Sequence, residues 1–166
     1  MKLQLKAIEN LLSENKFPEA YSIRALPSSG SERQYFRVDF EDGSIDSILA
    51  AYNPDAQENI AWNSFSSHFN SLGFRVPEIL ARDELYRYFL LQDLGNTSLF
   101  YHVSQGINKE VIGYYKRALQ DLIRFQVEGI KGLDLDVAYP AITFDRRSVM
   151  WDLNYFKYYF VKPNGI

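Results

Sequence analysis

The chain has 166 residues, 46% hydrophobic and 16% aromatic, which is enough for a substantial core in one domain, or in one domain and part of a second. Its net charge of −3, with no cluster of Lys and Arg, argues against a nucleic-acid-binding protein, and the absence of cysteine excludes disulfides, thiolate zinc sites and a Cys nucleophile. Because charges interrupt the opening "MKLQLKAIENLLSENK" and no apolar run approaches the roughly 18 residues of a membrane span, we expect a cytoplasmic protein without a signal peptide, membrane segment or nucleic-acid partner.

The first half of the chain shows two helical patterns separated by three strand patterns. Leucines and an isoleucine recur at helical spacing near the start, and Phe36, Val38 and Phe40 alternate with polar residues as in a half-buried strand. The dipeptide Asp42-Gly43 is a strong signal for a hairpin turn. The predicted elements are a helix at 3–15, strands at 20–26, 33–40 and 44–52, and a helix at 53–74 with Gly73 as its C-cap.

The second half of the chain begins with two strand patterns and continues with helices. The stripe from Ile107 to Phe125 has clean helical spacing, and residues 129–143 have the composition of a loop. The predicted elements are strands at 76–83 and 86–95, a helix at about 107–125 and an aromatic helix at 145–160. Because the strands precede most of the helices, the pattern favours an α+β fold of about five antiparallel strands, with one crossing helix after the third strand.

Three stretches occur in an order that resembles a known family. They are "GSERQYFRV" at 30–38, "FLLQDLG" at 89–95 and "FDRRSVMWDLNYFKYYF" at 144–160. The chain resembles the amino-terminal part of the aminoglycoside phosphotransferase and choline kinase family, in particular the branch that phosphorylates cell-wall sugars such as N-acetylmuramate. The resemblance implies a protein-kinase-like amino-terminal lobe with a hinge at its end over 1–95, followed by the truncated start of a helical carboxy-terminal lobe over 96–166.

The small residues before the second strand are candidates for binding phosphate. Glycine and serine between two strands allow backbone N–H groups to point at phosphate oxygens. We expect Ser29, Gly30 and Ser31 to do this, with a hydroxyl from Ser31 and a guanidinium from Arg33. The alternative is an ordinary surface hairpin loop, because Gly/Ser loops are common.

The stretch "FLLQDLG" is a candidate for binding adenine. A strand that emerges from the core into a crevice offers backbone groups, and adenine needs one acceptor and one donor at a fixed spacing. The resemblance assigns these roles to the carbonyl of Gln92 and the N–H of Leu94. The alternative is an edge strand that ends in a turn.

Two features depart from the kinase pattern. Many kinases carry a Lys on the third strand that pairs with a Glu on the following helix, but Ala50 and Ala51 stand at that place here. Glu58 is the only candidate for the helix Glu, and we expect it to be exposed and without its partner. A catalytic H-x-D-x-x-x-x-N loop is also missing, because neither His68 nor His102 is followed two residues later by Asp.

These departures leave the chain without a predicted catalytic residue or metal ligand. Asp134 and Asp136 come too early for the family's catalytic loop, so we interpret them as solvated acids and the two histidines as ordinary surface or partly buried residues. No G-x-S-x-G motif and no metal-ligand spacing is present. We therefore expect a nucleotide-binding lobe that is inactive alone.

The leading hypothesis is a fragment of an ATP-dependent phosphotransferase whose acceptor is an alcohol group of a sugar or aminoglycoside-type small molecule. The resemblance implies ATP and Mg²⁺ as cofactors of the full-length protein, and we expect this chain alone to bind neither tightly. The alternative is a non-catalytic kinase-like module that binds a partner protein through its aromatic carboxy-terminal helix. That helix carries six aromatic residues within ten positions, which also predicts a homodimer through residues 145–160.

Overall fold

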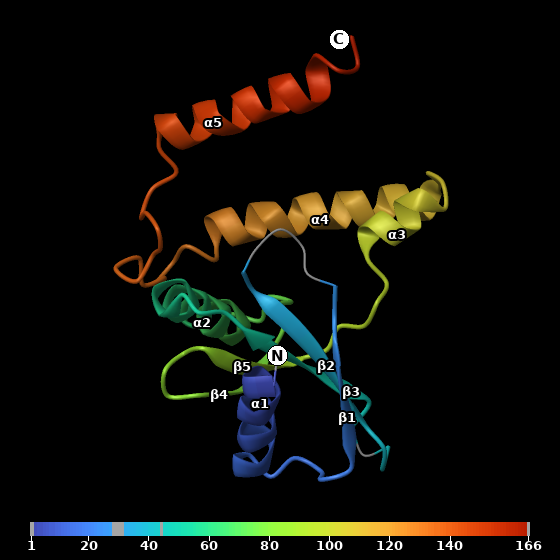
Figure 1. Ribbon diagram of the computed structural model, residues 1–166. Helices are drawn as coiled ribbons and strands as arrows, with labels where there is room; N and C mark the ends of the chain where they lie inside the picture. The colour runs from blue at the N-terminus through green and yellow to red at the C-terminus, as the bar shows by residue number, and fades with distance from the viewer. Residues whose placement is uncertain (1, 28–31, 44, 166) are drawn as a thin grey trace.

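The computed structural model describes residues 2–27, 32–43 and 45–165 (Figure 1). The fold is a mixed α+β structure with one five-stranded antiparallel sheet and several helices, as expected from the order of the sequence patterns. The strands are β1 (Tyr21–Ala25), β2 (Gln34–Phe40), β3 (Ser47–Tyr52), β4 (Ile79–Arg82) and β5 (Tyr88–Gln92). The helices are α1 (Lys2–Glu14), α2 (Ala56–Ser71), α3 (Leu99–Ser104), α4 (Lys109–Val127), α5 (Arg146–Phe156) and a π-helical turn, η1 (Lys157–Val161).

The sheet has the strand order β1-β2-β3-β5-β4, and every neighbouring pair is antiparallel. The first three strands form a meander, and β5 joins the open side of β3 after the chain has passed through α2 and β4. The register aligns Tyr52 with both Gln34 and Tyr88 at one end of the strands. At the other end Ile48 is aligned with Val38 and Gln92.

One face of the sheet packs against α1. The alternation in β2 places Phe36, Val38 and Phe40 on this face, as the sequence predicts, and all three are buried. They form one core with Ile8, Leu11 and Leu12 of α1 and with Ile48, Ala50 and Leu90 of the neighbouring strands. The first helix is therefore part of the hydrophobic core that supports the sheet.

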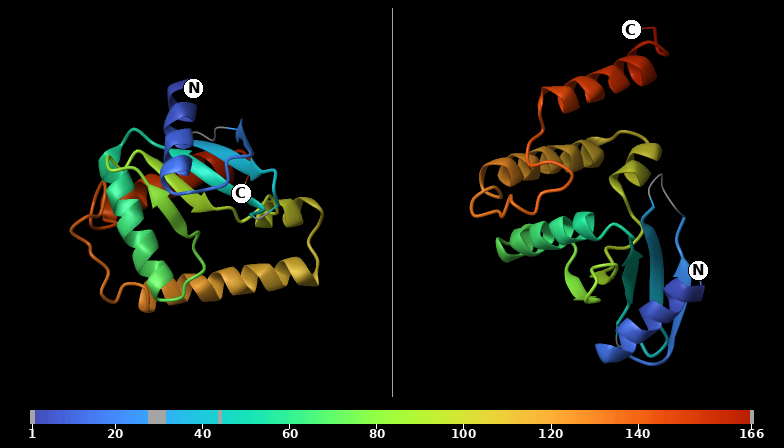
Figure 2. Two further views of the ribbon diagram at one scale, coloured as in Figure 1. Left: turned by 90° about the horizontal axis from the view of Figure 1, so that it is seen from below. Right: turned by 60° about the vertical axis from the view of Figure 1, so that its left-hand side comes forward.

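The other face of the sheet packs against α2, so that the two helices lie on opposite sides of it (Figure 2, right). Trp62 of α2 meets Phe89 edge-on, with ring centroids 5.0 Å apart. Buried Ala51 and Leu91 complete this smaller cluster. Helix α2 begins at the N-cap Asp55, and Gly73 turns the chain out of its C-terminal end with φ at +74°.

Helix α4 packs on the C-terminal end of α2 through aromatic rings. Phe125 contacts Phe69 at 5.0 Å and Phe74 at 4.4 Å between centroids. The predicted stripe on α4 forms a helix, but most of it is not buried. Val111 is 2% exposed, whereas Leu122 and Tyr115 are 50% and 46% exposed. Much of this apolar helix face therefore has no packing partner among the described residues.

Helix α5 stands clear of the sheet and of the other helices, as Figures 1 and 2 both show. The predicted aromatic helix at 145–160 is confirmed as α5 and η1. Its six aromatic residues are all at least half exposed, namely Trp151, Tyr155, Phe156, Tyr158, Tyr159 and Phe160. No helix in the described part of the chain is long and apolar enough to cross a membrane.

The short helix α3 is the main element that the sequence pattern did not predict. Six residues are too few to display helical periodicity. The signal was instead its N-cap, because the hydroxyl of Ser98 accepts a hydrogen bond from the backbone N–H of Tyr101 at 3.1 Å. The other differences are shorter strands than the sequence patterns had suggested.

The core makes a direct prediction for stability. Leu90 is 0% exposed at the centre of the sheet, whereas Leu85, in the turn before β5, is 66% exposed. We expect Leu90→Ala to lower the free energy of unfolding by about 2–5 kcal/mol, because it removes buried methyl groups and leaves a cavity. Leu85→Ala should change it by less than about 0.5 kcal/mol. Urea denaturation followed by circular dichroism measures both, and equal effects would contradict the described core.

Candidate functional site

Arg33 lies immediately before β2, and its side chain reaches the first turn of α2. One guanidinium nitrogen, Nη2, donates to Oε1 of Glu58 at 2.9 Å and to Oδ1 of Asn59 at 3.1 Å. The guanidinium carbon also lies 5.4 Å from the centre of the Trp62 ring. With 12% of its side chain exposed, Arg33 is held in place by three residues of one helix and still reaches the surface.

Asn59 joins α2 to the sheet. It is 1% exposed, and its Nδ2 donates to the backbone carbonyls of Asn53 at 2.9 Å and Tyr86 at 2.6 Å. Because Asn53 follows β3 and Tyr86 precedes β5, one side chain fixes two connections of the sheet. The side chain of Asn53 in turn donates to Oε2 of Glu58 at 3.0 Å. Glu58 therefore has a separate donor on each carboxylate oxygen.

The N-terminus of α2 also receives a contact from the loop that follows α4. Asp55 caps the helix by accepting hydrogen bonds from the backbone N–H groups of Gln57 and Glu58 at 3.0 and 3.1 Å. The hydrogen bond from Glu58, and then one from the Tyr139 hydroxyl, lower the pKa of Asp55 below its ordinary value. The same contact with Asp55 raises the pKa of Tyr139. The loop that contains Tyr139, more than 80 residues further along the chain, thus supports the end of α2 that carries Glu58. We expect it to stabilise this helix end about as much as one capping interaction does.

Glu58 is exposed, as predicted, and the third strand offers it no Lys. The sequence did not predict that Glu58 has a different cationic partner. Glu58 is 49% exposed and is ion-paired with Arg33, which immediately precedes the second strand. Ala50 and Ala51 are buried on opposite faces of β3, against the α1 and α2 sides of the sheet. The third strand therefore supplies no cation at this place, and Arg33 does.

A second arginine of β2 organises the turn after β5. The Nε atom of Arg37 lies 2.5 Å from Oδ2 of Asp93, and Nη2 donates to Oδ1 of Asp93 at 3.1 Å. The Asp93 carboxylate also accepts from the Ser47 hydroxyl at 2.8 Å and from the backbone N–H of Gly95 at 2.7 Å. Both side chains are almost fully buried, with 6% and 3% exposed. The turn of "QDLG" is thus fixed by a buried ion pair.

The candidate adenine-binding groups lie at this turn, away from Arg33. Gln92 is the last residue of β5, and its backbone N–H donates to the Glu78 carbonyl at 2.9 Å. Leu94 is 65% exposed, and its N–H donates to no residue in the described parts of the chain. The register places Gln92 level with Val38, five residues along β2 from Arg33, which is about 17 Å. Arg33 and the turn therefore lie at opposite ends of the same strands.

The remaining predicted residues divide into two groups. Ser29, Gly30 and Ser31 lie outside the described residues. His68 and His102 each contact another residue of the fold. A ring nitrogen of His68 lies 2.9 Å from the Gly129 carbonyl, and the ring of His102 lies 4.8 Å from that of Tyr114.

The acidic residues of the later loop do not form a metal site. Asp134 and Asp136 are both exposed, in agreement with the prediction of solvated acids. Over residues 2–27, 32–43 and 45–165, no group of three or more His, Cys, Asp or Glu side chains is arranged to hold a metal ion.

Comparisons with known proteins return no match: no family model, no curated protein and no solved structure is significantly similar to this chain.

Sequence reasoning missed the partners of both arginines. In the sequence, Arg37 is a polar position of the alternating strand within "GSERQYFRV", and Asp93 is the acid of "FLLQDLG". Arginine in the middle of a strand between buried apolar residues is a signal for a buried partner, because an unpaired buried charge is very costly. The sequence alone does not say which acid that partner is.

The Arg37–Asp93 pair predicts a dependence of stability on pH. Burial alone raises the pKa of Asp93, but the hydrogen bonds from Gly95, Ser47 and Arg37, together with the charge of Arg37, outweigh it and hold the pKa below its ordinary value. The carboxylate therefore stabilises the fold above the unfolded-state pKa of about 3.9, and this contribution is lost as pH falls through the lower folded-state pKa.

We expect Asp93→Asn to lower the free energy of unfolding by about 3 kcal/mol at pH 7, because Arg37 stays buried without its counter-ion. The difference from the unsubstituted protein should shrink as the pH is lowered below about 4. Urea denaturation at a series of pH values measures this, with exposed Asp152→Asn as the control. A difference that stays constant down to the lowest pH would contradict a stabilising Asp93 carboxylate.

Proposed function

We propose that this chain is the nucleotide-binding lobe of an ATP-dependent phosphotransferase that acts on an alcohol group of a small molecule, and that it is inactive alone. Two observations support the proposal. One is the five-stranded antiparallel sheet with its crossing helix. The other is the set of three sequence stretches that occur in the same order as in the aminoglycoside phosphotransferase and choline kinase family, which they resemble. The whole molecule would supply a catalytic loop and Mg²⁺-binding acids that the described residues lack.

The observation that carries the proposal is the ion pair between Arg33 and Glu58. Protein kinases pair a Lys of the third strand with a Glu of the following helix, and the Lys holds the phosphates of ATP. Here Glu58 is also on the helix after the third strand, while the cation is the residue that precedes the neighbouring strand. A guanidinium has five N–H donors in a planar fork, and both carboxylate and phosphate oxygens match its geometry.

The rest of the site is consistent with an elongated ligand. In the proposal, Arg33 and the loop that includes Ser29, Gly30 and Ser31 bind the phosphates, and the backbone of Gln92 and Leu94 binds adenine. A nucleoside triphosphate has its base and its phosphates at opposite ends, and among the described residues Arg33 and Gln92 lie at opposite ends of β2, β3 and β5. The Arg37–Asp93 pair would keep the turn at the adenine end in one conformation.

Binding of ATP tests the proposal. We expect a dissociation constant on the order of 1 mM, because half of the nucleotide crevice would come from the remainder of the enzyme. Arg33→Ala should weaken binding at least about tenfold, since it removes a charge-assisted contact to phosphate. Titration of ATP, followed by NMR shifts of backbone amides near Gln92 and Arg33, measures both constants.

The matched control is Arg24→Ala, which removes an exposed arginine of β1 that pairs with Asp39 at 3.0 Å. It should leave ATP binding unchanged, and circular dichroism should show both variants to be folded. Failure of ATP at 10 mM to shift any amide, or equal losses in the two variants, would count against a nucleotide site at Arg33.

A second candidate function is a non-catalytic module that associates through α5 and η1. Stacked pairs line two sides of this helix, with Tyr155 and Tyr159 at 4.4 Å and Phe156 and Phe160 at 5.1 Å between centroids. Beside the first pair lies a hollow of about 270 Å³, which Trp151 and Tyr158 also line. Exposed aromatic surface of this extent is typical of an interface.

We propose a second copy of the chain as the occupant of this surface. Six half-exposed aromatic side chains at roughly 100 Å² each give about 600 Å² per copy, which approaches the about 800 Å² per partner of a stable interface. A twofold arrangement would let the same surface face itself.

Light scattering coupled to size exclusion measures this association. We expect a dimer, and we expect the double substitution Trp151→Ser and Tyr159→Ser to shift it to a monomer, because these two side chains are 74% and 71% exposed. Phe100→Ser on α3, where the ring is 81% exposed, is the control and should leave the dimer intact. A monomer at high concentration of the unsubstituted protein would rule out the dimer without affecting the ATP proposal.

A further inference from the structure

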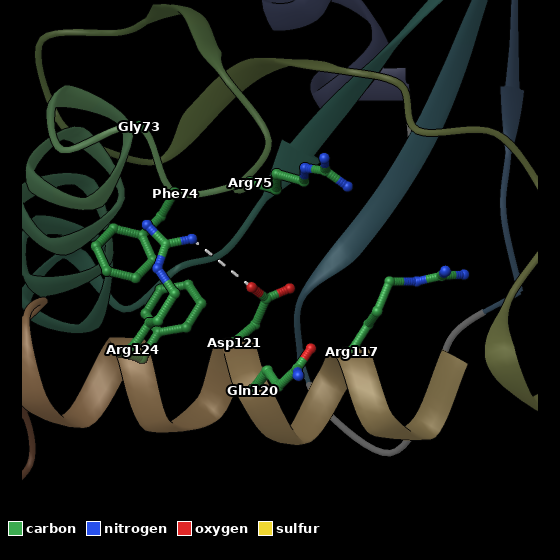
Figure 3. Close-up of a pocket in the computed structure, with 8 residues that line it drawn as sticks. Gly73, Phe74, Arg75, Arg117, Gln120, Asp121 and Arg124 are labelled. Carbon is green, nitrogen blue, oxygen red and sulfur yellow. Dashed lines mark ion pairs between the residues drawn. The ribbon is translucent and has the colours of Figure 1, made fainter. Parts of the chain in front are cut away.

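A pocket of about 360 Å³ lies between α4 and the segment that follows α2 (Figure 3). The wall on the α2 side is formed by Gly73, Phe74 and Arg75, and the wall on the α4 side includes Arg117, Asp121 and Arg124. Three guanidinium groups and one carboxylate thus line one small pocket. None of these residues belongs to the site proposed for ATP.

The backbone conformation at Gly73 directs the side chain of Phe74 into the protein and that of Arg75 toward solvent. Gly73 adopts φ of +74° and ends α2 by donating its N–H to the carbonyl of Asn70 at 2.9 Å. Phe74 then turns inward and is 5% exposed, while Arg75 is exposed at the pocket. The rings of Phe74 and Phe125, 4.4 Å apart, hold this segment against α4.

The α4 wall is a row of residues on one side of the helix. Arg117, Asp121 and Arg124 follow each other at spacings of four and three residues, which brings them to the same face. Arg124 stacks on Phe74 at 4.9 Å and is paired with Asp121 at 3.8 Å and with Glu128 at 3.4 Å. The carboxylates near the pocket are therefore already engaged with Arg124.

The other two arginines are not neutralised. Arg117 lies over the ring of Tyr114 at 4.9 Å, and within the described residues neither Arg117 nor Arg75 forms a hydrogen bond or an ion pair. They come from opposite walls, and Figure 3 shows both side chains extending toward the same end of the pocket. Two uncompensated guanidinium groups across a hollow favour a ligand with two negative charges.

We infer that this pocket binds a small phosphomonoester. A phosphate group above its second pKa of about 6 carries nearly two charges and has three acceptor oxygens, which match two arginine forks better than a single carboxylate does. The volume is at the lower end of the range for small-molecule sites, so there is room for a phosphate and a short polar body. Gln120, which also lines the pocket, offers an amide to hydroxyl groups of that body.

The pocket is separate from the proposed nucleotide site. Glu58 lies in the first turn of α2, whereas the pocket begins beyond its last turn. The fourteen residues between Glu58 and Leu72 correspond to about 21 Å along the helix axis. Arg33 therefore cannot contact a ligand in the pocket, and the two sites can be tested separately.

Inorganic phosphate and glycerol 3-phosphate are the probes, titrated at pH 7.5 into the ¹⁵N-labelled chain. We expect millimolar binding that shifts the backbone amides of residues 73–75 and 117–124. The double substitution Arg75→Gln and Arg117→Gln should weaken binding of both probes at least about tenfold. Asp121→Asn should strengthen it several-fold, because it removes the one carboxylate that lines the pocket.

Two controls make the result specific. Arg147→Gln removes an exposed arginine near the start of α5 and should leave binding unchanged. Acetate should bind at least about tenfold more weakly than phosphate. The inference is overturned if the amides of residues 73–75 and 117–124 do not shift, if Arg147→Gln weakens binding as much as the double substitution, or if acetate binds equally well.

Discussion

The side-chain amide of Asn59 is the contact on which the arrangement of the proposed site depends. It donates to the carbonyl that follows β3 and to the carbonyl that precedes β5, and its oxygen accepts from Arg33. All of its hydrogen-bonding atoms are therefore used in a position that is 1% exposed, where an unsatisfied amide would cost about 1–3 kcal/mol. Helix α2 is held by this residue at one fixed rotation against the sheet, and that rotation decides that Glu58, one residue earlier, meets Arg33.

Arg33 and Arg37, in and just before the second strand, differ in burial, and this difference gives them different roles. Arg33 and Arg37 are four residues apart and so belong to the same face of the sheet. Arg37 is closed in with Asp93 and is structural, because a buried charge with its counter-ion is satisfied and inaccessible. Arg33 donates to a carboxylate and to an amide oxygen of α2 and remains partly exposed. In the proposal, Arg33 is therefore the one of the two that contacts the ligand.

The helices after the sheet expose more apolar surface to solvent than the sheet does. The sheet is covered by α1 and α2, whereas α4, α5 and η1 expose Leu119, Ile123, Trp151 and Tyr159 at 60% or more. The helices form nonetheless, because each has its own N-cap, Asn108 for α4 and Asp145 for α5. Local capping and amphipathic spacing thus specify a helix without specifying what covers it, and the uncovered surface favours association.

The sequence by itself determined most of the elements and the faces of the sheet, but not the short helix α3. Alternation in β2 predicted that Phe36, Val38 and Phe40 point into one core, and Gly73 predicted the end of α2, because both signals depend on a few neighbouring residues. The pairing of Arg33 with Glu58 and of Arg37 with Asp93 was decided only by the tertiary structure. These partners are 25 and 56 residues apart, and no local periodicity links them. Which acid faces which arginine follows from the register of the strands and the rotation of α2, which exist only once the sheet and its helices have packed.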